Sequence, residues 1–122
     1  NGILYIGDGF NIQQVDPSDM SKTNNNSVAS DDIIGITSDS SVYIYTYDDN
    51  GEVGKVDPSN LSNIGKNGSG NFRTSFGISL ASDGTLFSVD GKFILESFDK
   101  NDMTTSSLFD LSPDEIWAIA AE

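Results

Sequence analysis

The stretch Val56-Asp57-Pro58-Ser59-Asn60-Leu61-Ser62 determines how the rest of the chain is interpreted. A similar stretch, Val15-Asp16-Pro17-Ser18-Asp19-Met20-Ser21, stands 41 residues earlier, and Phe98-Asp99-Lys100-Asn101-Asp102-Met103-Thr104 stands 42 residues later. In each, an apolar residue and an Asp are followed by turn-forming residues and a second apolar residue. Recurrence at a near-constant period indicates a repeat architecture, in which these stretches are turns and not binding motifs.

Between these stretches, short β-prone runs alternate with turns. The turn dipeptides Asp8-Gly9 and Asp83-Gly84 and the loop Asp48-Asp49-Asn50-Gly51 predict β-hairpins. The expected strands cover residues 3–6, 11–15, part of 20–30, 33–37, 42–47, 53–56, 76–80, 85–89, 93–98 and 104–109. Residues 33–37 form a continuous apolar run, which predicts a strand buried on both faces. Residues 63–71 are rich in Gly and Asn and are expected to form a loop excursion.

One strand of each unit shows a pattern of large, small and β-branched residues. The aligned positions are Ile34, Phe76 and Trp117, then Gly35, Gly77 and Ala118, then Ile36, Ile78 and Ile119. Gly weakens a strand, so its recurrence predicts close backbone approach around a common axis. The alignment also predicts a strand at residues 116–120, against the helix propensity of their alanines.

Units of about 40–45 residues with four short strands are typical of a β-propeller. We therefore predict an all-β chain of propeller blades, each a four-stranded antiparallel meander. The predicted blades span approximately residues 1–30, 31–72 and 73–111, with residues 112–122 as the inner strand of the next or the first blade. The chain thus holds about as many strands as three blades. Their order is permuted, because the first strand of the chain is the second strand of a blade. Because rings need about four to eight blades, the chain is either half of a six-bladed ring of two copies or a segment of a longer polypeptide. A β-sandwich or a β-solenoid is the competing fold.

The stretch from Gly77 to Asp90, GISLASDGTLFSVD, resembles the inner strand, Asp-Gly turn and second strand of NHL-type propellers. The Val-Asp-Pro ending of the third strand is similar to that of YVTN and quinoprotein-type blades. The resemblance covers nearly the whole chain and implies the propeller fold without selecting one family. The Trp-Asp ending of WD40 blades, the kelch glycine doublet and the quinoprotein tryptophan motif are absent.

Composition restricts the chemistry of the chain. The net charge is −13, from 19 acidic and 6 basic residues, which disfavours binding to nucleic acid or to an anionic membrane. No His or Cys is present, so Ser-His-Asp catalysis and thiolate chemistry are excluded. No apolar run approaches the ~18 residues of a membrane-spanning helix.

Three clusters contain residues that can carry chemistry. The acidic loop Asp48–Glu52 is the densest set of oxygen ligands for Ca²⁺, but it lacks the EF-hand spacing. The acid pairs Asp31-Asp32 and Asp114-Glu115 precede aligned inner strands and could act as acid and base. Tyr43, Tyr45 and Tyr47 alternate on one strand, where packing between blades is favoured over sugar stacking. We assign no catalytic, cofactor-binding or metal-binding residue and expect no cofactor.

Three functions fit these observations. The first is a non-enzymatic structural or recognition module of an extracellular, cell-surface or virion-appendage assembly. The second is a fragment of a six-bladed propeller enzyme, such as a metal-assisted hydrolase or lactonase. The third is an engineered half-propeller. The expected partners are other propeller blades, from the parent chain or a second copy, with a protein or glycan ligand possible, and with neither nucleic acid binding nor membrane insertion.

Overall fold

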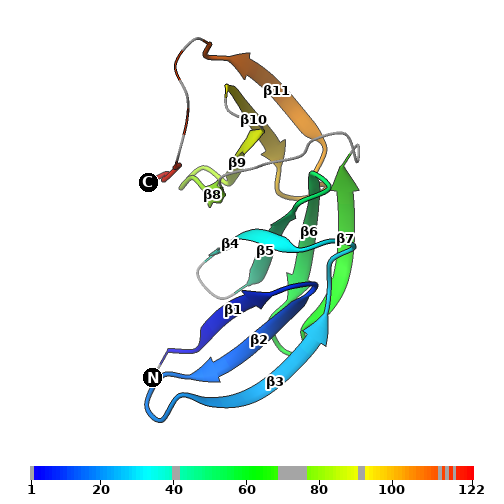
Figure 1. The fold of residues 1–122 in the computed structure, drawn as a ribbon, viewed down its shortest axis with the longest axis vertical. Helices are drawn as coiled ribbons and strands as arrows, with labels where there is room; N and C mark the ends of the chain where they lie inside the picture. Colours follow the sequence, from blue (N-terminus) through cyan, green and yellow to red (C-terminus); the bar gives the residue numbers. More distant parts are fainter. Residues whose placement is uncertain are drawn as a thin grey trace.

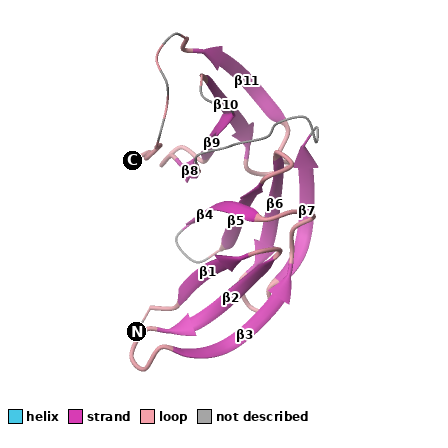
Figure 2. Cartoon of the chain, viewed as in Figure 1, coloured by secondary structure: helices cyan, strands magenta, loops and turns pink. Residues whose placement is uncertain are grey.

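The computed structural model describes residues 2–39, 42–68, 77–90, 93–112, 114, 116 and 118–122. All regular structure in these residues is β-strand, and the strands form three antiparallel sheets (Figures 1 and 2). The first sheet holds β1 (Leu4–Asp8), β2 (Asn11–Asp16) and β3 (Ser21–Ser27). The second holds β4 (Ile33–Asp39), β5 (Tyr43–Asp48), β6 (Glu52–Asp57) and β7 (Ser62–Gly68). The third holds β8 (Ile78–Leu80), β9 (Thr85–Asp90), β10 (Ile94–Asp99) and β11 (Thr105–Asp110).

Each sheet is a meander in which every strand pairs with its neighbour in the sequence, as predicted. The three sheets follow one another along an arc, with β3, β7 and β11 on the convex side and β4 and β8 on the concave side (Figure 1). Strand β1 corresponds to β5, since Leu4 lies opposite Val15 and Ile44 lies opposite Val56. The described chain therefore begins at the second strand of a sheet, in agreement with the sequence.

Two apolar clusters hold adjacent sheets together. Ile12, Val28, Ile44, Val56 and Leu61 pack between the first and second sheets. Tyr45, Tyr47, Val53, Ile78, Leu86, Phe98 and Met103 pack between the second and third sheets. Successive residues of β5 join different clusters because side chains alternate across a strand. Burial of Tyr45 and Tyr47, with Tyr47 edge-on to Phe98 at 6.5 Å, confirms that these tyrosines pack between sheets.

The three repeated stretches form one kind of corner, from the third strand of a sheet to its outermost strand. In the second corner, Asp57 Oδ1 accepts hydrogen bonds from Ser59 N at 2.8 Å and from Ser59 Oγ at 2.6 Å. The Leu61 N–H donates to Asp57 O at 2.8 Å, and the other two corners repeat this bond at 2.8 and 2.7 Å. Each corner also follows an irregularity in strand register. The shared bonds confirm that the repeated motif is a structural turn.

Counted from the Asp that begins each corner, the fifth residue has a positive φ, although it is not Gly in any of the three corners. The angles are 58° at Met20, 55° at Leu61 and 58° at Met103. Left-handed backbone costs an L-residue about 1–2 kcal/mol, so other interactions must hold these residues in place. Leu61 and Met103 are 0% and 5% exposed because they enter the inter-sheet clusters, whereas Met20 is 64% exposed because no described sheet precedes the first one.

The small residues of the inner strands mark a close approach of backbones, as predicted. A Cβ atom on Gly35 would lie 2.8 Å from Ile78 N and 3.0 Å from Gly77 Cα. Gly77 itself has φ +129°, a conformation that side chains rarely adopt. Strands β4 and β8 therefore meet at the concave side with no space for a side chain between them.

Three expectations from the sequence differ from the structure. Residues 63–71 were expected to be a loop, but Ser62–Gly68 forms β7, because pairing with β6 outweighs the low β-propensity of Asn and Gly. Strand β4 is half-buried and not fully buried, since it lies at the concave edge. The described residues of 116–120 are in no strand, because no second strand lies beside them to complete a ladder. The predicted position Phe76 lies outside the described residues.

We expect Gly35→Ala to destabilise the protein by about 1–3 kcal/mol, because the added methyl group would collide with backbone atoms of the next sheet. Gly2→Ala is the matched control, since a Cβ there would meet nothing within 4 Å. Urea unfolding followed by tryptophan fluorescence measures both changes. Equal stability of the two variants would contradict the close approach of β4 and β8.

We expect Leu61→Ala to cost about 2–5 kcal/mol, because this corner residue fills the cluster between the first and second sheets. Ile64→Ala, on the outermost strand β7 and 49% exposed, should change stability by less than about 0.5 kcal/mol. The same urea titration compares them. A loss as small for Leu61 as for Ile64 would show that the corner does not join the two sheets.

Candidate functional site

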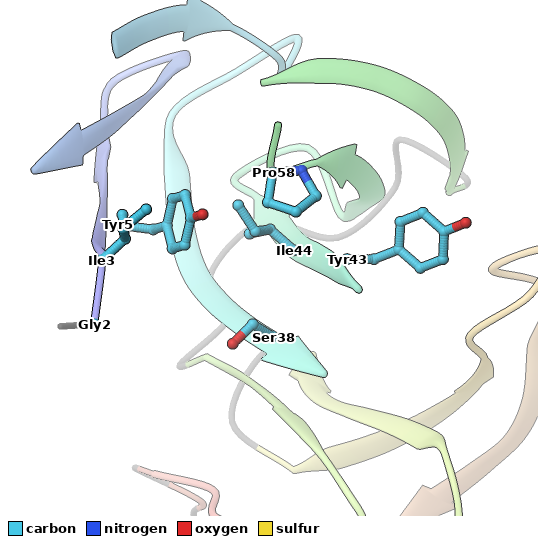
Figure 3. Close-up of a pocket in the computed structure, with 7 residues that line it drawn as sticks. All are labelled: Gly2, Ile3, Tyr5, Ser38, Tyr43, Ile44 and Pro58. Carbon is cyan, nitrogen blue, oxygen red and sulfur yellow. The ribbon is translucent and has the colours of Figure 1, made fainter. Parts of the chain in front are cut away.

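A pocket of about 360 Å³ lies between the first and second sheets. Its lining comes from β1 and the residues before it, from the end of β4, from the start of β5 and from the second corner (Figure 3). The lining residues are Gly2, Ile3, Tyr5, Ser38, Tyr43, Ile44 and Pro58. A second hollow of about 230 Å³ continues it and adds Leu4, Ile36 and Thr37. We call these two hollows together the β1 groove.

None of the residues lining the β1 groove is charged, although the chain carries −13 overall. The hydroxyl-bearing side chains Tyr5, Ser38 and Thr37 are among its lining residues, whereas the ring of Tyr43 points away from Tyr5 (Figure 3). Tyr43 is held in place, because Lys55 Nζ lies 4.2 Å from its ring centroid and its own N–H donates to Asp39 Oδ1 at 2.7 Å. An apolar wall with a few hydroxyls is suited to an uncharged peptide segment or an aromatic group.

A third hollow, of about 320 Å³, lies on the third sheet and is polar. Its lining includes Asp83, Asp99 and Lys100. Asp83 Oδ1 accepts the Thr85 N–H at 2.8 Å, and Asp99 Oδ1 accepts the Asn101 N–H at 2.8 Å. Both carboxylates therefore serve the turns that they begin.

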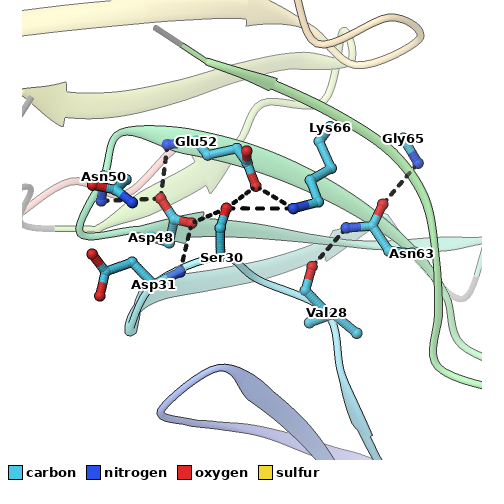
Figure 4. Close-up of polar contacts among 9 residues, drawn as sticks. All are labelled: Val28, Ser30, Asp31, Asp48, Asn50, Glu52, Asn63, Gly65 and Lys66. Atoms are coloured by element: carbon cyan, nitrogen blue, oxygen red, sulfur yellow. Dashed lines mark hydrogen bonds and ion pairs between the residues drawn. The ribbon is translucent and has the colours of Figure 1, made fainter. Parts of the chain in front are cut away.

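Asp48, at the centre of the acidic loop, is a structural acceptor. It is 1% exposed, and its Oδ1 accepts the N–H groups of Asn50 at 3.1 Å and Glu52 at 2.9 Å (Figure 4). Its Oδ2 faces the Asp31 N–H at 3.3 Å and the Ser30 hydroxyl at 3.5 Å. Asp48 thereby ties the hairpin after β5 to the segment before β4.

Glu52 is also engaged, because it accepts a hydrogen bond from Ser30 Oγ at 2.8 Å and pairs with Lys66 Nζ at 2.9 Å (Figure 4). Among the residues that the structure describes, no group of three or more acidic side chains is placed to hold a metal ion. The calcium ligand set considered for Asp48–Glu52 is therefore not assembled in this part of the molecule.

Of the two acid pairs that precede inner strands, only Asp31-Asp32 is described completely by the structure. Asp32 O accepts the Asp49 N–H at 2.9 Å, and Asp31 Oδ1 accepts the Asp32 N–H at 2.8 Å, so the first pair is tied to the acidic loop. Glu115 of the second pair lies outside the described residues. The two pairs therefore cannot be matched as one acid–base site.

Six exposed aspartates each accept hydrogen bonds from the hydroxyl and the N–H of the residue two positions later. They are Asp16, Asp19, Asp57, Asp83, Asp102 and Asp110. These bonds favour the ionised form and lower the pKa of each carboxyl. For Asp57, the Ser59 hydroxyl lowers the pKa most, followed by the Ser59 N–H. In contrast, burial raises the pKa of the Tyr45 phenol, and the charge of Asp39 raises it further.

Comparison with known proteins identifies the fold through structure and not through sequence. No family model matches the chain, and no curated protein matches its sequence. Among solved structures, hydrazine synthase of Kuenenia stuttgartiensis matches 94% of this chain with a TM-score of 0.77 and 18% identity. A chain of the mitotic checkpoint complex matches 95% of it with a TM-score of 0.77 and 15% identity. Apo AztD from Citrobacter koseri matches 94% with a TM-score of 0.73 and 14% identity. All three are β-propeller proteins.

This chain is a partial β-propeller. It spans only 34%, 37% and 34% of the three matched chains, about a third of their length. The three sheets are therefore propeller blades, with β4 and β8 innermost and β3, β7 and β11 outermost. Because the sequence identities are below one fifth, these similarities show the fold alone. They do not show the type of propeller or the function.

Sequence reasoning found the turn-forming acids but missed the β1 groove. Tyr5 and Ile44 come from different blades, and they line the same hollow only because the blades pack face to face. A signal was available, since Tyr5 aligns with the core residue Tyr45 when the strands are matched by register. The described residues contain no helix with the length and apolarity of a membrane span.

We expect the capping contribution of Asp57 to be present at neutral pH and lost in acid. The pKa of this carboxyl in the folded state is below its unfolded value of 3.8, so the stabilisation is complete above 3.8 and disappears as the pH falls through the folded pKa. Asp57→Asn keeps a side-chain oxygen without the charge. Urea unfolding of both proteins from about pH 7 to about pH 2 should therefore give curves that differ at neutral pH and converge in acid. A difference that is independent of pH would refute a charged cap.

Proposed function

We propose that this chain is a non-enzymatic β-propeller module with a structural or recognition role in a larger assembly. The observation that supports this proposal is the set of hydrogen bonds that the carboxylates accept within the chain. The carboxylates of Asp48 and Asp31 accept hydrogen bonds from the chain's own N–H groups, whereas the β1 groove is lined by uncharged side chains. A hydrolytic metal site instead needs carboxylates free to bind the ion or a water molecule.

The inner strands support the same proposal. Residues 33–38 of β4 and 78–80 of β8 are apolar or neutral. The acid that ends β4, Asp39, accepts hydrogen bonds from Tyr43 N and, at 3.2 Å, from the Tyr45 hydroxyl, and it lies 3.6 Å from Lys100 Nζ. This carboxylate joins the second and third blades and is not directed at a substrate.

We further propose that the assembly is extracellular, on a cell surface or on a virion appendage, and that the ligand is a protein or a glycan. The support is compositional: the chain has a charge of −13, no Cys and no His. The hydroxyl and ring of Tyr5 in the β1 groove would contact such a ligand. The matched chain of the mitotic checkpoint complex is one example of a propeller that belongs to a multiprotein assembly.

The test separates a module from a metal-assisted hydrolase. We expect excess EDTA to leave the thermal unfolding temperature unchanged, and we expect no hydrolysis of ester or lactone substrates with or without Ca²⁺, Mg²⁺ or Zn²⁺. Metal-dependent hydrolysis that is lost in the double variant Asp31→Asn, Asp32→Asn would establish the enzyme instead. The variant Asp49→Asn, a nearby exposed acid, is the control for nonspecific loss of charge.

A second measurement addresses location and recognition. Antibodies against the chain should label the surface of the source cell or particle, and the chain should bind components of a surface extract through the β1 groove. Tyr5→Ala is expected to weaken that binding, with Val42→Ala, an exposed residue that does not line the groove, as the control. Labelling confined to the cell interior would contradict the proposed location.

A further inference from the structure

Three stretches of the chain match the sequon for N-linked glycans, which is Asn, any residue except Pro, and then Ser or Thr. They are Asn25-Asn26-Ser27, Asn60-Leu61-Ser62 and Asn67-Gly68-Ser69. A chain rich in Asn and Ser matches this pattern by chance, so the pattern alone selects none of them. The structure distinguishes the three by their backbone conformation and by the hydrogen bonds that their amides already make.

The second sequon lies in the second corner, where Asn60 is exposed. Its Oδ1 accepts the Ser62 N–H at 2.8 Å, so the oxygen of the amide shapes the turn. Among the described residues, its Nδ2 has no hydrogen-bond partner. The nitrogen is the atom to which an N-linked glycan is joined. The corner therefore uses one end of the Asn60 amide and leaves the other end in solvent.

The turn also brings together the two groups that define a sequon. Because the third residue must carry a hydroxyl, the amide and that hydroxyl have to be close to each other when the sugar is transferred. In the second corner, the bond between Asn60 Oδ1 and Ser62 N draws these two residues together. The native conformation of this sequon is thus already bent in the sense that transfer requires.

The other two sequons lack this arrangement. Asn25 lies within β3, an extended strand paired with β2. Its neighbour Asn26 is occupied, since Asn26 Nδ2 donates to Leu61 O at 2.8 Å and Asn26 Oδ1 accepts the Ser27 N–H at 3.0 Å. The third sequon ends at Ser69, which lies outside the described residues. The second sequon is therefore the one that the structure favours.

Comparison of the three corners shows that the amide of Asn60 is not needed for the turn. Asp19 and Asp102 stand at the same place in the first and third corners. Their Oδ1 atoms accept the N–H groups of Ser21 at 2.9 Å and Thr104 at 3.0 Å. All three corners thus have the same bond and the same following hydroxyl residue. Only the second has an amide nitrogen in place of a second carboxylate oxygen.

We propose that Asn60 is the attachment site of an N-linked glycan, an inference that rests on the extracellular location proposed above. The sugar donor is an oligosaccharide joined to a lipid through pyrophosphate. Asn60 Nδ2 forms a C–N bond to the anomeric carbon, and the C–O bond to the lipid pyrophosphate breaks. The pyrophosphate leaves with the electron pair, and the amide gives up one proton to a base of the transferring enzyme. No oxidant or reductant is needed.

Burial of the middle residue determines when this transfer takes place. Leu61 is 0% exposed in the cluster between the first and second sheets, so the folded corner withholds it from an enzyme. Transfer therefore precedes the packing of these sheets, whereas the turn needs only bonds within residues 57–62. In the folded protein the glycan extends from the exposed Asn60 side chain. A bulky, hydrated group there keeps the second corner in solvent and out of protein contacts.

The first experiment secretes the full 122-residue chain from eukaryotic cells behind a cleaved signal peptide. We expect mass spectrometry to find an added glycan that peptide N-glycosidase removes, with conversion of Asn60 to Asp. Asn60→Asp keeps the turn, as in the other corners, and Ser62→Ala removes the hydroxyl; each should lose the glycan. Asn25→Gln should retain it. Folded, secreted protein with an unmodified Asn60 would overturn the proposal.

The second experiment transfers the site to the equivalent corners. Asp19→Asn and Asp102→Asn each complete a sequon, because Ser21 and Thr104 are already in place. We expect each variant to carry a second glycan in the secreted protein. The double variant Asp19→Asn, Ser21→Ala is the control and should carry only the first. If neither single variant gained a glycan, the corner would not be what makes Asn60 an acceptor.

The glycan and the extracellular location can fail separately in protein isolated from its source. Surface-labelled protein with an unmodified Asn60 would overturn the glycan and leave the location standing. Protein confined to the cell interior with an unmodified Asn60 would overturn both. A glycan released from Asn60 by peptide N-glycosidase, on protein labelled at the surface, is the result that we expect.

Discussion

Adjacent blades are joined at the corner by an apolar residue in a left-handed conformation, and the rest of the architecture depends on that contact. An Asp caps the turn, the main chain closes a hydrogen bond to the fifth residue, and the side chain of that residue enters the core between two sheets. The conformation costs about 1–2 kcal/mol, and burial of a Leu or Met side chain offsets this cost at two of the three corners. One local motif thus ends the third strand, begins the outermost strand and fixes the position of the neighbouring blade.

The concave side has the complementary constraint, because strands that are separated at the outer rim converge there. The backbones approach so closely that Gly35 has no room for a side chain, and Gly77 has φ +129°, a conformation that side chains rarely adopt. The corners therefore set the spacing of the blades at the outside, and the glycines allow the inner strands to meet. The curvature of the array of sheets follows from these two spacings (Figure 1).

The sequence was sufficient to predict the order of the strands and the crowded position at Gly35, because these depend on local turn chemistry and on a repeated small residue. It failed for β7, where Asn and Gly indicated a loop but pairing with β6 imposed a strand. It also differed from the structure at residues 116–120, where the aligned pattern predicted a strand and the described residues form none. The β1 groove could not be predicted, since Tyr5 and Ile44 become neighbours only when two sheets pack.

The acidity of the chain is largely a consequence of its turns. Of the 19 acidic residues 15 are Asp, and within the described residues eight of these accept a hydrogen bond from the N–H of the residue two positions later. Selection of Asp for turn geometry gives the surface a strong negative field, which opposes association with other acidic surfaces. The uncharged β1 groove is an exception to that field. Electrostatic repulsion of another acidic surface is therefore weakest at the β1 groove.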